Sequence, residues 1–139
     1  MSIKRKASAH WEGNGKTGTG TLTTASGILN AAAYSSNARF ENAQGTNPEE
    51  LIGAAHAGCF SMKLAYYFQA ENLTPDSIDT QAVVHMEEGI ITEIHLHTSV
   101  KISGIDLMKF ETLVDLAKEN CPVSKLVKAK IILTSELIN

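Results

Sequence analysis

Positive charge of the kind that binds nucleic acid is scarce in this 139-residue chain. Charged residues make up 19% of it, the formal net charge is −3, and only Arg5 and Arg39 are arginines. Non-specific binding to nucleic acid depends on clustered lysine and arginine, so we expect no nucleic-acid partner. A site that requires a guanidinium group has two candidates. The low charged share also suggests that extra surface is buried in an oligomer.

A long hydrophobic segment is lacking as well. The basic N-terminus, residues 1–13, has no apolar stretch behind it, so we expect no signal peptide. The most apolar run, residues 51–68, is interrupted by His56 and Lys63 and follows two glutamates, which argues against a membrane span. We therefore expect a cytoplasmic protein that has no membrane partner and forms a single domain over residues 1–139.

Cysteine is limited to Cys59 and Cys121. A chain of this length can bury a sizeable core without disulfide staples, so the two cysteines raise a question of reactivity rather than of stability. They lie about sixty residues apart, which gives neither a Cys-x-x-Cys redox motif nor a zinc-ligand pattern. Only the fold can bring them together.

Hydrophobic periodicity and turn residues predict an α+β fold. Most strand-like runs form hairpins, with glycine-containing turns at residues 13–15 and 87–89. The expected elements are, in chain order, two strands within residues 3–27, a short strand near 28–30, an extended segment at 39–41, a helix from 48 to about 72, two strands within 77–102, a helix at 106–120, a short helix from 122 and a strand at 129–138. The order of regular elements is therefore β-β-β-α-β-β-α-α-β.

Two of these elements have a well-defined apolar face. In the second strand of the later hairpin, mainly apolar residues alternate with polar ones. We expect one face of this strand to be buried, and that face comprises Ile94, Leu96, Thr98, Val100 and Ile102. The helix at 106–120 follows Asp106 as a plausible cap, and its expected apolar stripe comprises Leu107, Phe110, Leu113, Val114 and Ala117.

The long helix carries two glutamates in its first turn. Asn47 is a suitable N-cap, and Pro48 occupies the first helical position. Glu50 stands three residues after the cap, as in a capping box. Because one glutamate is enough for the cap, Glu49 is free to hold an arginine in place.

Cys59 lies in the middle of this helix among small residues. Free cysteine is common in protein cores, so packing alone explains a thiol here. Gly53 and Gly58 destabilise a helix, however, and they permit close approach of another backbone or a ligand. The helix N-terminus is too distant to lower the pKa of Cys59, because its effect fades within the first turn. A reactive thiol therefore requires a cation from elsewhere, and Arg39 is the natural candidate.

Two further residues bear on thiol chemistry. His56 stands one turn before Cys59 on the same helix face and is a candidate base for a cysteine hydrolase, although packing is the simpler interpretation. Cys121 precedes Pro122, which places its thiol at the start of a helix, where backbone N–H groups favour a thiolate. Its alternative role is that of an ordinary N-cap.

With these residues assembled, the sequence resembles the OsmC/Ohr family of hydroperoxide reductases. The first cysteine motif of that family is matched by "NPEELIGAAHAGCF" and the second by "CPVSK", with support from "AHWEG", "ARFE" and "SIDT". The similarity covers nearly the whole chain. Ohr proteins carry their active-site arginine in the N-terminal hairpin, where this chain has Lys16. The OsmC branch carries it in the segment that matches Ala38-Arg39-Phe40, so the resemblance is to that branch.

The resemblance implies a two-layer α+β fold that forms an intertwined homodimer with central cysteine-bearing helices. It also implies a peroxidase for oxidative or osmotic stress defence, in which Cys59 reduces an organic hydroperoxide and Cys121 then forms a disulfide with Cys59. An external dithiol, with a lipoylated protein as one candidate, would restore both thiols. Arg39 would assist the reaction and Glu49 would orient Arg39, with Glu50 as the alternative partner. No metal, haem or flavin is expected.

Two other classes of function stay open at this point. One is a hydrolase that uses Cys59 as nucleophile and His56 as base. The other is a non-catalytic, small-molecule-binding stress protein in which the two cysteines only pack.

Overall fold

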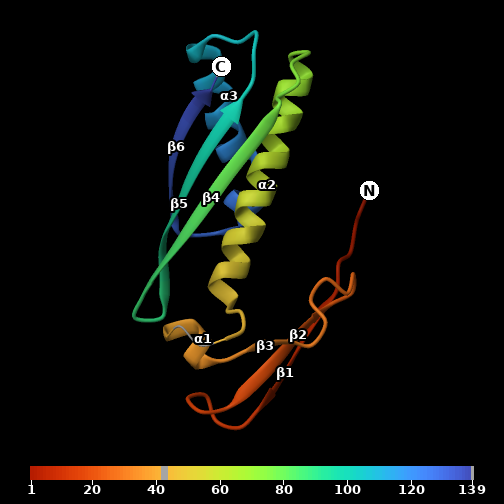
Figure 1. The fold of residues 1–139 in the computed structure, drawn as a ribbon, viewed down its shortest axis with the longest axis vertical. Coiled ribbons are helices and arrows are strands. Elements are labelled where there is room, and N and C mark those ends of the chain that lie inside the picture. Colours follow the sequence, from red (N-terminus) through yellow and green to blue (C-terminus); the bar gives the residue numbers. More distant parts are fainter. Residues whose placement is uncertain (42–43, 139) are drawn as a thin grey trace. The chain divides into compact units, whose positions relative to one another are not determined.

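The computed structural model describes residues 1–41 and 44–138, and the chain divides into two compact units, Met1–Leu51 and Ile52–Asn139. The described residues form two three-stranded sheets and four helices, so the predicted α+β class is confirmed (Figure 1). Each unit contains one of the sheets. None of the described helices is both long and apolar enough to cross a membrane.

The first unit contains three strands and a short helix. These elements are β1 (Ala7–Glu12), β2 (Thr19–Thr24), β3 (Ala32–Tyr34) and α1 (Ser36–Phe40). Both strand pairs are antiparallel, in the order β1-β2-β3. The predicted first hairpin is confirmed, and the side chain of Asn14 fixes its turn. The carboxamide oxygen of Asn14 accepts hydrogen bonds from the backbone N–H groups of Lys16 at 3.0 Å and Thr17 at 2.7 Å.

The third strand lies later in the chain than we predicted. The expectation of a strand near residues 28–30 was wrong, and β3 begins only at Ala32. Threonine hydroxyls on β2 accept hydrogen bonds from backbone N–H groups that would otherwise be available for pairing between strands. Leu29 N donates to Thr24 Oγ1 at 3.2 Å, and Ala31 N donates to Thr23 Oγ1 at 3.0 Å. Such local side-chain bonds compete with strand pairing.

The segment that contains Arg39 is helical, whereas we predicted an extended segment at residues 39–41. Helix α1 forms because Ser35 is an effective N-cap, and its Oγ accepts a hydrogen bond from Ala38 N at 3.1 Å. The chain becomes extended only at Glu41, the C-cap. Arg39 therefore projects from the last turn of a helix.

The second unit contains most of the long helix, a mixed sheet and two further helices. The elements that follow α1 are α2 (Pro48–Ala70), β4 (Ser77–Glu87), β5 (Ile90–Lys101), α3 (Leu107–Asn120), α4 (Pro122–Leu126) and β6 (Lys130–Ile138). Strands β4 and β5 form the predicted hairpin, in which Glu88 and Gly89 both have positive φ, as a tight two-residue turn requires. Strand β6 then pairs with β5 in parallel, giving the order β4-β5-β6.

The core of the second unit lies between the sheet and helices α2 and α3. Its fully buried side chains include Phe60, Leu64, Phe68, Ile94, Leu96, Val100, Phe110 and Ala117. The predicted buried face of β5 is confirmed, and Asp106 caps α3 by accepting a hydrogen bond from Lys109 N at 2.8 Å. The prediction for Leu107 was wrong. It is 57% exposed because it lies at the first position of α3, ahead of the turns that face the sheet.

Candidate active site

Arg39 and Glu49 form a two-pronged ion pair between the last turn of α1 and the first turn of α2. The Nε of Arg39 donates to Glu49 Oε1, and its Nη2 donates to Glu49 Oε2 at 3.2 Å. Glu49 is 12% exposed and Arg39 is 38% exposed. The carboxylate thus fixes the plane of the guanidinium, as bidentate pairs do, and leaves part of the group accessible.

The neighbouring glutamate has a different partner. Glu50 Oε2 accepts a hydrogen bond from Thr46 Oγ1 at 2.7 Å, and Glu50 N donates to Asn47 Oδ1 at 2.8 Å. Asn47 is therefore the N-cap that the sequence predicted. The two glutamates in the first turn of α2 therefore have different partners. Glu50 supports the start of the helix, and Glu49 holds Arg39.

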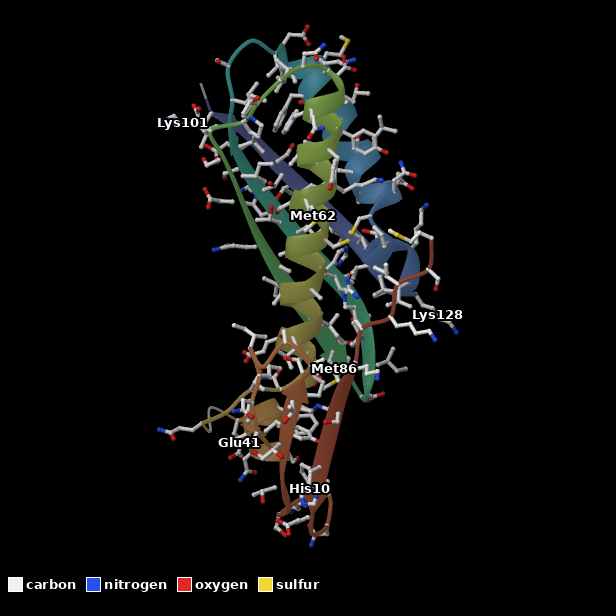
Figure 2. All side chains as sticks on the ribbon, turned by 90° about the vertical axis from the view of Figure 1, so that its right-hand side faces the viewer. His10, Glu41, Met62, Met86, Lys101 and Lys128 are labelled. Atoms are coloured by element: carbon white, nitrogen blue, oxygen red, sulfur yellow. The ribbon has the colours of Figure 1, made fainter. Side chains whose placement is uncertain are left out.

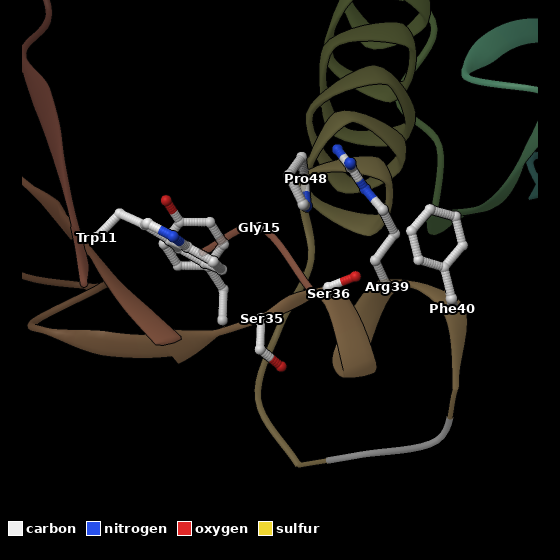
Figure 3. Close-up of a pocket in the computed structure, with 8 residues that line it drawn as sticks. Trp11, Gly15, Ser35, Ser36, Arg39, Phe40 and Pro48 are labelled. Atoms are coloured by element: carbon white, nitrogen blue, oxygen red, sulfur yellow. The ribbon is translucent and has the colours of Figure 1, made fainter. Parts of the chain in front are cut away.

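An aromatic cavity of about 350 Å³ adjoins Arg39 in the first unit (Figure 3). It is lined by Trp11, Gly15, Tyr34, Ser35, Ser36, Arg39, Phe40 and Pro48. The Trp11 and Tyr34 rings lie 5.4 Å apart between centroids, and the Arg39 Cζ lies 5.8 Å from the centroid of Phe40. Sequence reasoning missed this lining, although the motif "AHWEG" contains the only tryptophan of the chain.

Cys59 and Cys121, both free thiols, meet in the second unit. Cys59 is half-buried on α2, whereas Cys121 is fully buried between the end of α3 and the start of α4. The Cys59 sulfur lies close to the Cys121 side chain and to the backbone N–H of Val123, and both affect its pKa. The fold therefore brings together two residues whose spacing in the sequence gave no motif.

The surroundings of Cys59 oppose its ionisation. Burial raises the pKa of the Cys59 thiol above its ordinary value, and the neighbouring Cys121 raises it further. The Val123 N–H and the positive charge of Lys63 act in the opposite direction but do not prevail. In this arrangement the protonated thiol is favoured at neutral pH, so the site needs a further cation to generate a thiolate.

Lys63 is a cation that sequence reasoning noted only as an interruption of an apolar run. It lies one turn beyond Cys59 on α2, and its Nζ is 5.5 Å from the centroid of the Tyr67 ring. A cavity of about 230 Å³ exposes Cys59 and is lined by Cys59, Met62, Lys63, Tyr66 and Pro122. Met62, which projects from α2 (Figure 2), is 63% exposed. Cys59 therefore opens on a mainly apolar cavity with one positive charge at its wall.

His56 lies on the same helix but bonds elsewhere. It is fully buried, and its Nε2 is 2.8 Å from Ser124 Oγ on α4. Burial lowers the pKa of the imidazole, so the ring is neutral at neutral pH. Its Nδ1 has no hydrogen-bond partner among the residues that the structure describes. His56 is thus placed as a link between two helices, with Ser124 rather than Cys59 as its hydrogen-bond partner.

The chain is similar to known proteins over most of its length. The model of the OsmC-like protein family matches residues 41–136. The chain is 48% identical to peroxiredoxin OsmC of Escherichia coli (strain K12), over 99% of both chains. It is 32% identical to the organic hydroperoxide resistance protein OhrB of Bacillus subtilis (strain 168), over 85% of this chain and 88% of that protein. The crystal structure of Bacillus subtilis OhrB matches with a TM-score of 0.64 and 28% identity, over 96% of this chain and 98% of that chain.

The position of Lys63 predicts a measurable effect on Cys59. The charge of Lys63 lowers the pKa of the thiol, so Lys63→Met should raise that pKa and reduce the thiolate fraction at neutral pH. We expect alkylation by iodoacetamide at pH 7 to slow by about two- to fivefold, the range for a partly exposed charge pair. The whole pH profile of the alkylation rate should move to higher pH.

The measurement uses Cys121→Ser as the background, so that Cys59 is the only thiol. Iodoacetamide is uncharged, and the lysine therefore cannot act by attracting the reagent. Lys101→Met removes an equal charge from the exposed end of β5 and serves as the control. An unchanged profile in Lys63→Met, or a move to lower pH, would show that Lys63 does not act on the thiol.

Proposed function

Because the chain belongs to the family of OsmC-like proteins, as the sequence motifs predicted, we propose that it is a thiol-dependent peroxidase that reduces organic hydroperoxides to alcohols. The observation that carries the proposal is the meeting of the half-buried Cys59 with the buried Cys121 at an apolar cavity. A thiol that opens on a cavity and has a second thiol beside it is suited to reversible oxidation. Defence against oxidative or osmotic stress is the physiological role that fits this activity.

The reaction proceeds in three balanced steps. The Cys59 thiolate attacks the outer oxygen of ROOH, the O–O bond breaks, and the alkoxide takes up a proton and leaves as the alcohol. Cys59 is then a sulfenic acid. The Cys121 sulfur attacks the Cys59 sulfur, the S–O bond breaks, and water leaves as the disulfide forms. An external dithiol reduces this disulfide by thiol–disulfide exchange and is itself oxidised, and a lipoylated protein is one candidate for it.

Arg39 supplies the cation that Cys59 lacks. Burial and Cys121 raise the pKa of Cys59, and Lys63 alone does not compensate. In the proposed mechanism the Arg39 guanidinium stabilises the thiolate and donates hydrogen bonds to the oxygen on which negative charge develops. Glu49 is the positioning residue, since its bidentate contact sets the orientation of the guanidinium. Sulfur carries the electrons, so no metal, haem or flavin takes part.

We propose that residues 1–139 act as one domain within an intertwined homodimer. The exposed face of α2 supports this, because Met62 and Tyr66 are 63% and 59% exposed there. A Cβ at Gly58 would meet nothing within 4 Å in a single chain, which leaves room for a second copy to approach. In such a dimer Arg39 serves Cys59 of its own chain or of the partner, and the chemistry is the same for both.

The hydrolase alternative depends on His56 as the base for Cys59. A cysteine hydrolase needs a histidine within hydrogen-bond reach of the nucleophile. The His56 ring is fully buried, and its Nε2 lies 2.8 Å from Ser124 Oγ instead of bonding to Cys59. A protein in which the cysteines only pack would not need the cavity beside Cys59.

Removal of the Cys59 sulfur tests the proposed activity most simply. Cys59→Ser should abolish consumption of tert-butyl hydroperoxide in the presence of a dithiol, because an alcohol cannot form a sulfenic acid. The dithiol-dependent loss of peroxide is measured by the ferrous–xylenol orange assay. A Cys59→Ser protein that retains full turnover would remove the peroxidase proposal, while a folded wild-type chain without turnover would favour the packing alternative.

The role of Arg39 requires its planar, two-pronged geometry. Arg39→Lys keeps the charge but loses the fork that Glu49 orients, so kcat/KM for tert-butyl hydroperoxide should fall by roughly a hundredfold, as when an oriented donor is lost. Arg5→Lys is the matched control, since Arg5 donates to the carbonyl of its neighbour Lys4 and is exposed. Activity of Arg39→Lys close to that of the control would exclude Arg39 from the site.

A further inference from the structure

The second cysteine lies at the start of a very short helix, and something must hold that helix in place. Helix α4 has only five residues, Pro122–Leu126, and Cys121 is both its N-cap and the C-cap of α3. A helix this short has little stability of its own. The position of the Cys121 thiol relative to Cys59 therefore depends on the contacts that α4 makes with its neighbours.

Helix α4 meets α2 at two successive residues. The backbone N–H of Val123 lies close enough to the Cys59 sulfur to affect its pKa, and Ser124 Oγ lies 2.8 Å from His56 Nε2. The first of these contacts involves the reacting sulfur itself, which changes its bonding when it becomes a sulfenic acid. The second involves no reacting atom and joins residues 68 positions apart in the sequence. We therefore expect it to persist while Cys59 is oxidised.

The His56 ring depends on Ser124 for its polar contact. The ring is fully buried and, among the described residues, its Nδ1 has no hydrogen-bond partner. Loss of the Ser124 hydroxyl would leave both ring nitrogens buried without a partner, and such groups are costly. The ring and α4 would then shift relative to one another. Burial lowers the pKa of His56, so the contact is one of a neutral imidazole with a hydroxyl.

We propose that the hydrogen bond between His56 and Ser124 is a positioning contact for the second step of the reaction, the attack of Cys121 on the Cys59 sulfenic acid. It holds α4 against α2, so that the Cys121 sulfur stays within reach of the Cys59 sulfur after the alcohol has left. A disulfide needs two sulfurs about 2 Å apart with Cα atoms about 4.4–6.8 Å apart, so a displacement of α4 makes its formation slower. In this step the S–S bond forms, the S–O bond breaks and water leaves. The inference rests on the proposed function.

The test measures how much of the Cys59 sulfenic acid forms the disulfide and how much is captured by an added reagent. One equivalent of tert-butyl hydroperoxide is added with an excess of dimedone, which captures sulfenic acid, and intact mass gives the ratio of disulfide to dimedone adduct. Ser124→Ala should lower this ratio by about three- to tenfold, the effect of one lost hydrogen bond. The rate at which Cys59 is first oxidised should change much less, because the contact does not involve the peroxide.

Two further variants separate positioning from a general loss of stability. Ser124→Thr keeps the hydroxyl and should restore the ratio. Ser61→Ala removes a comparable hydroxyl from α2, one that donates to Thr80 Oγ1 on β4 at 2.7 Å rather than to α4, so it should leave the ratio unchanged. If Ser124→Ala gives the wild-type ratio, or if Ser61→Ala lowers the ratio equally, the positioning role is wrong. If the wild-type chain itself forms no disulfide, the proposed function fails and this inference fails with it.

Discussion

The contact between the Cys59 and Cys121 thiols is the constraint on which the rest of the site depends. Helices α2 and α3 bury one face of the β4-β5-β6 sheet, and that packing brings the end of α3 to the middle of α2. The same burial that makes the contact possible raises the pKa of Cys59. A buried, protonated thiol is a poor nucleophile, and the proposed mechanism requires responses to that difficulty from other groups.

Those responses come from separate parts of the chain. Lys63 places one charge beside the Cys59 cavity, and both Lys63 and the Val123 N–H lower the pKa of the thiol. Glu49 fixes a guanidinium at Arg39, in the last turn of α1. In the proposed mechanism this oriented fork supplies the stabilisation that burial removes, and it acts where charge develops on the peroxide oxygen.

Local sequence patterns predicted the elements well where one residue determines the structure. Asn47 and Asp106 cap their helices as expected, and the alternation of Ile94 and Leu96 with polar residues gave the buried face of β5. The patterns failed where side chains compete with the backbone for hydrogen bonds, as they do just before β3. They could also not reveal contacts such as that between His56 and Ser124, because nothing in the periodicity of α2 specifies its partner 68 residues away. The motif resemblance named both cysteines, but only the fold shows what surrounds them.

The central claim is that the two thiols form one redox centre, and the mass of the intact chain after a single oxidation tests it most directly. One equivalent of an organic hydroperoxide, added to the reduced protein without any dithiol, should remove two hydrogens from each chain. Peptide mapping should then find Cys59 joined to Cys121 within the same chain. An unchanged mass, a stable gain of oxygen at Cys59, or a disulfide that joins two chains would contradict the account.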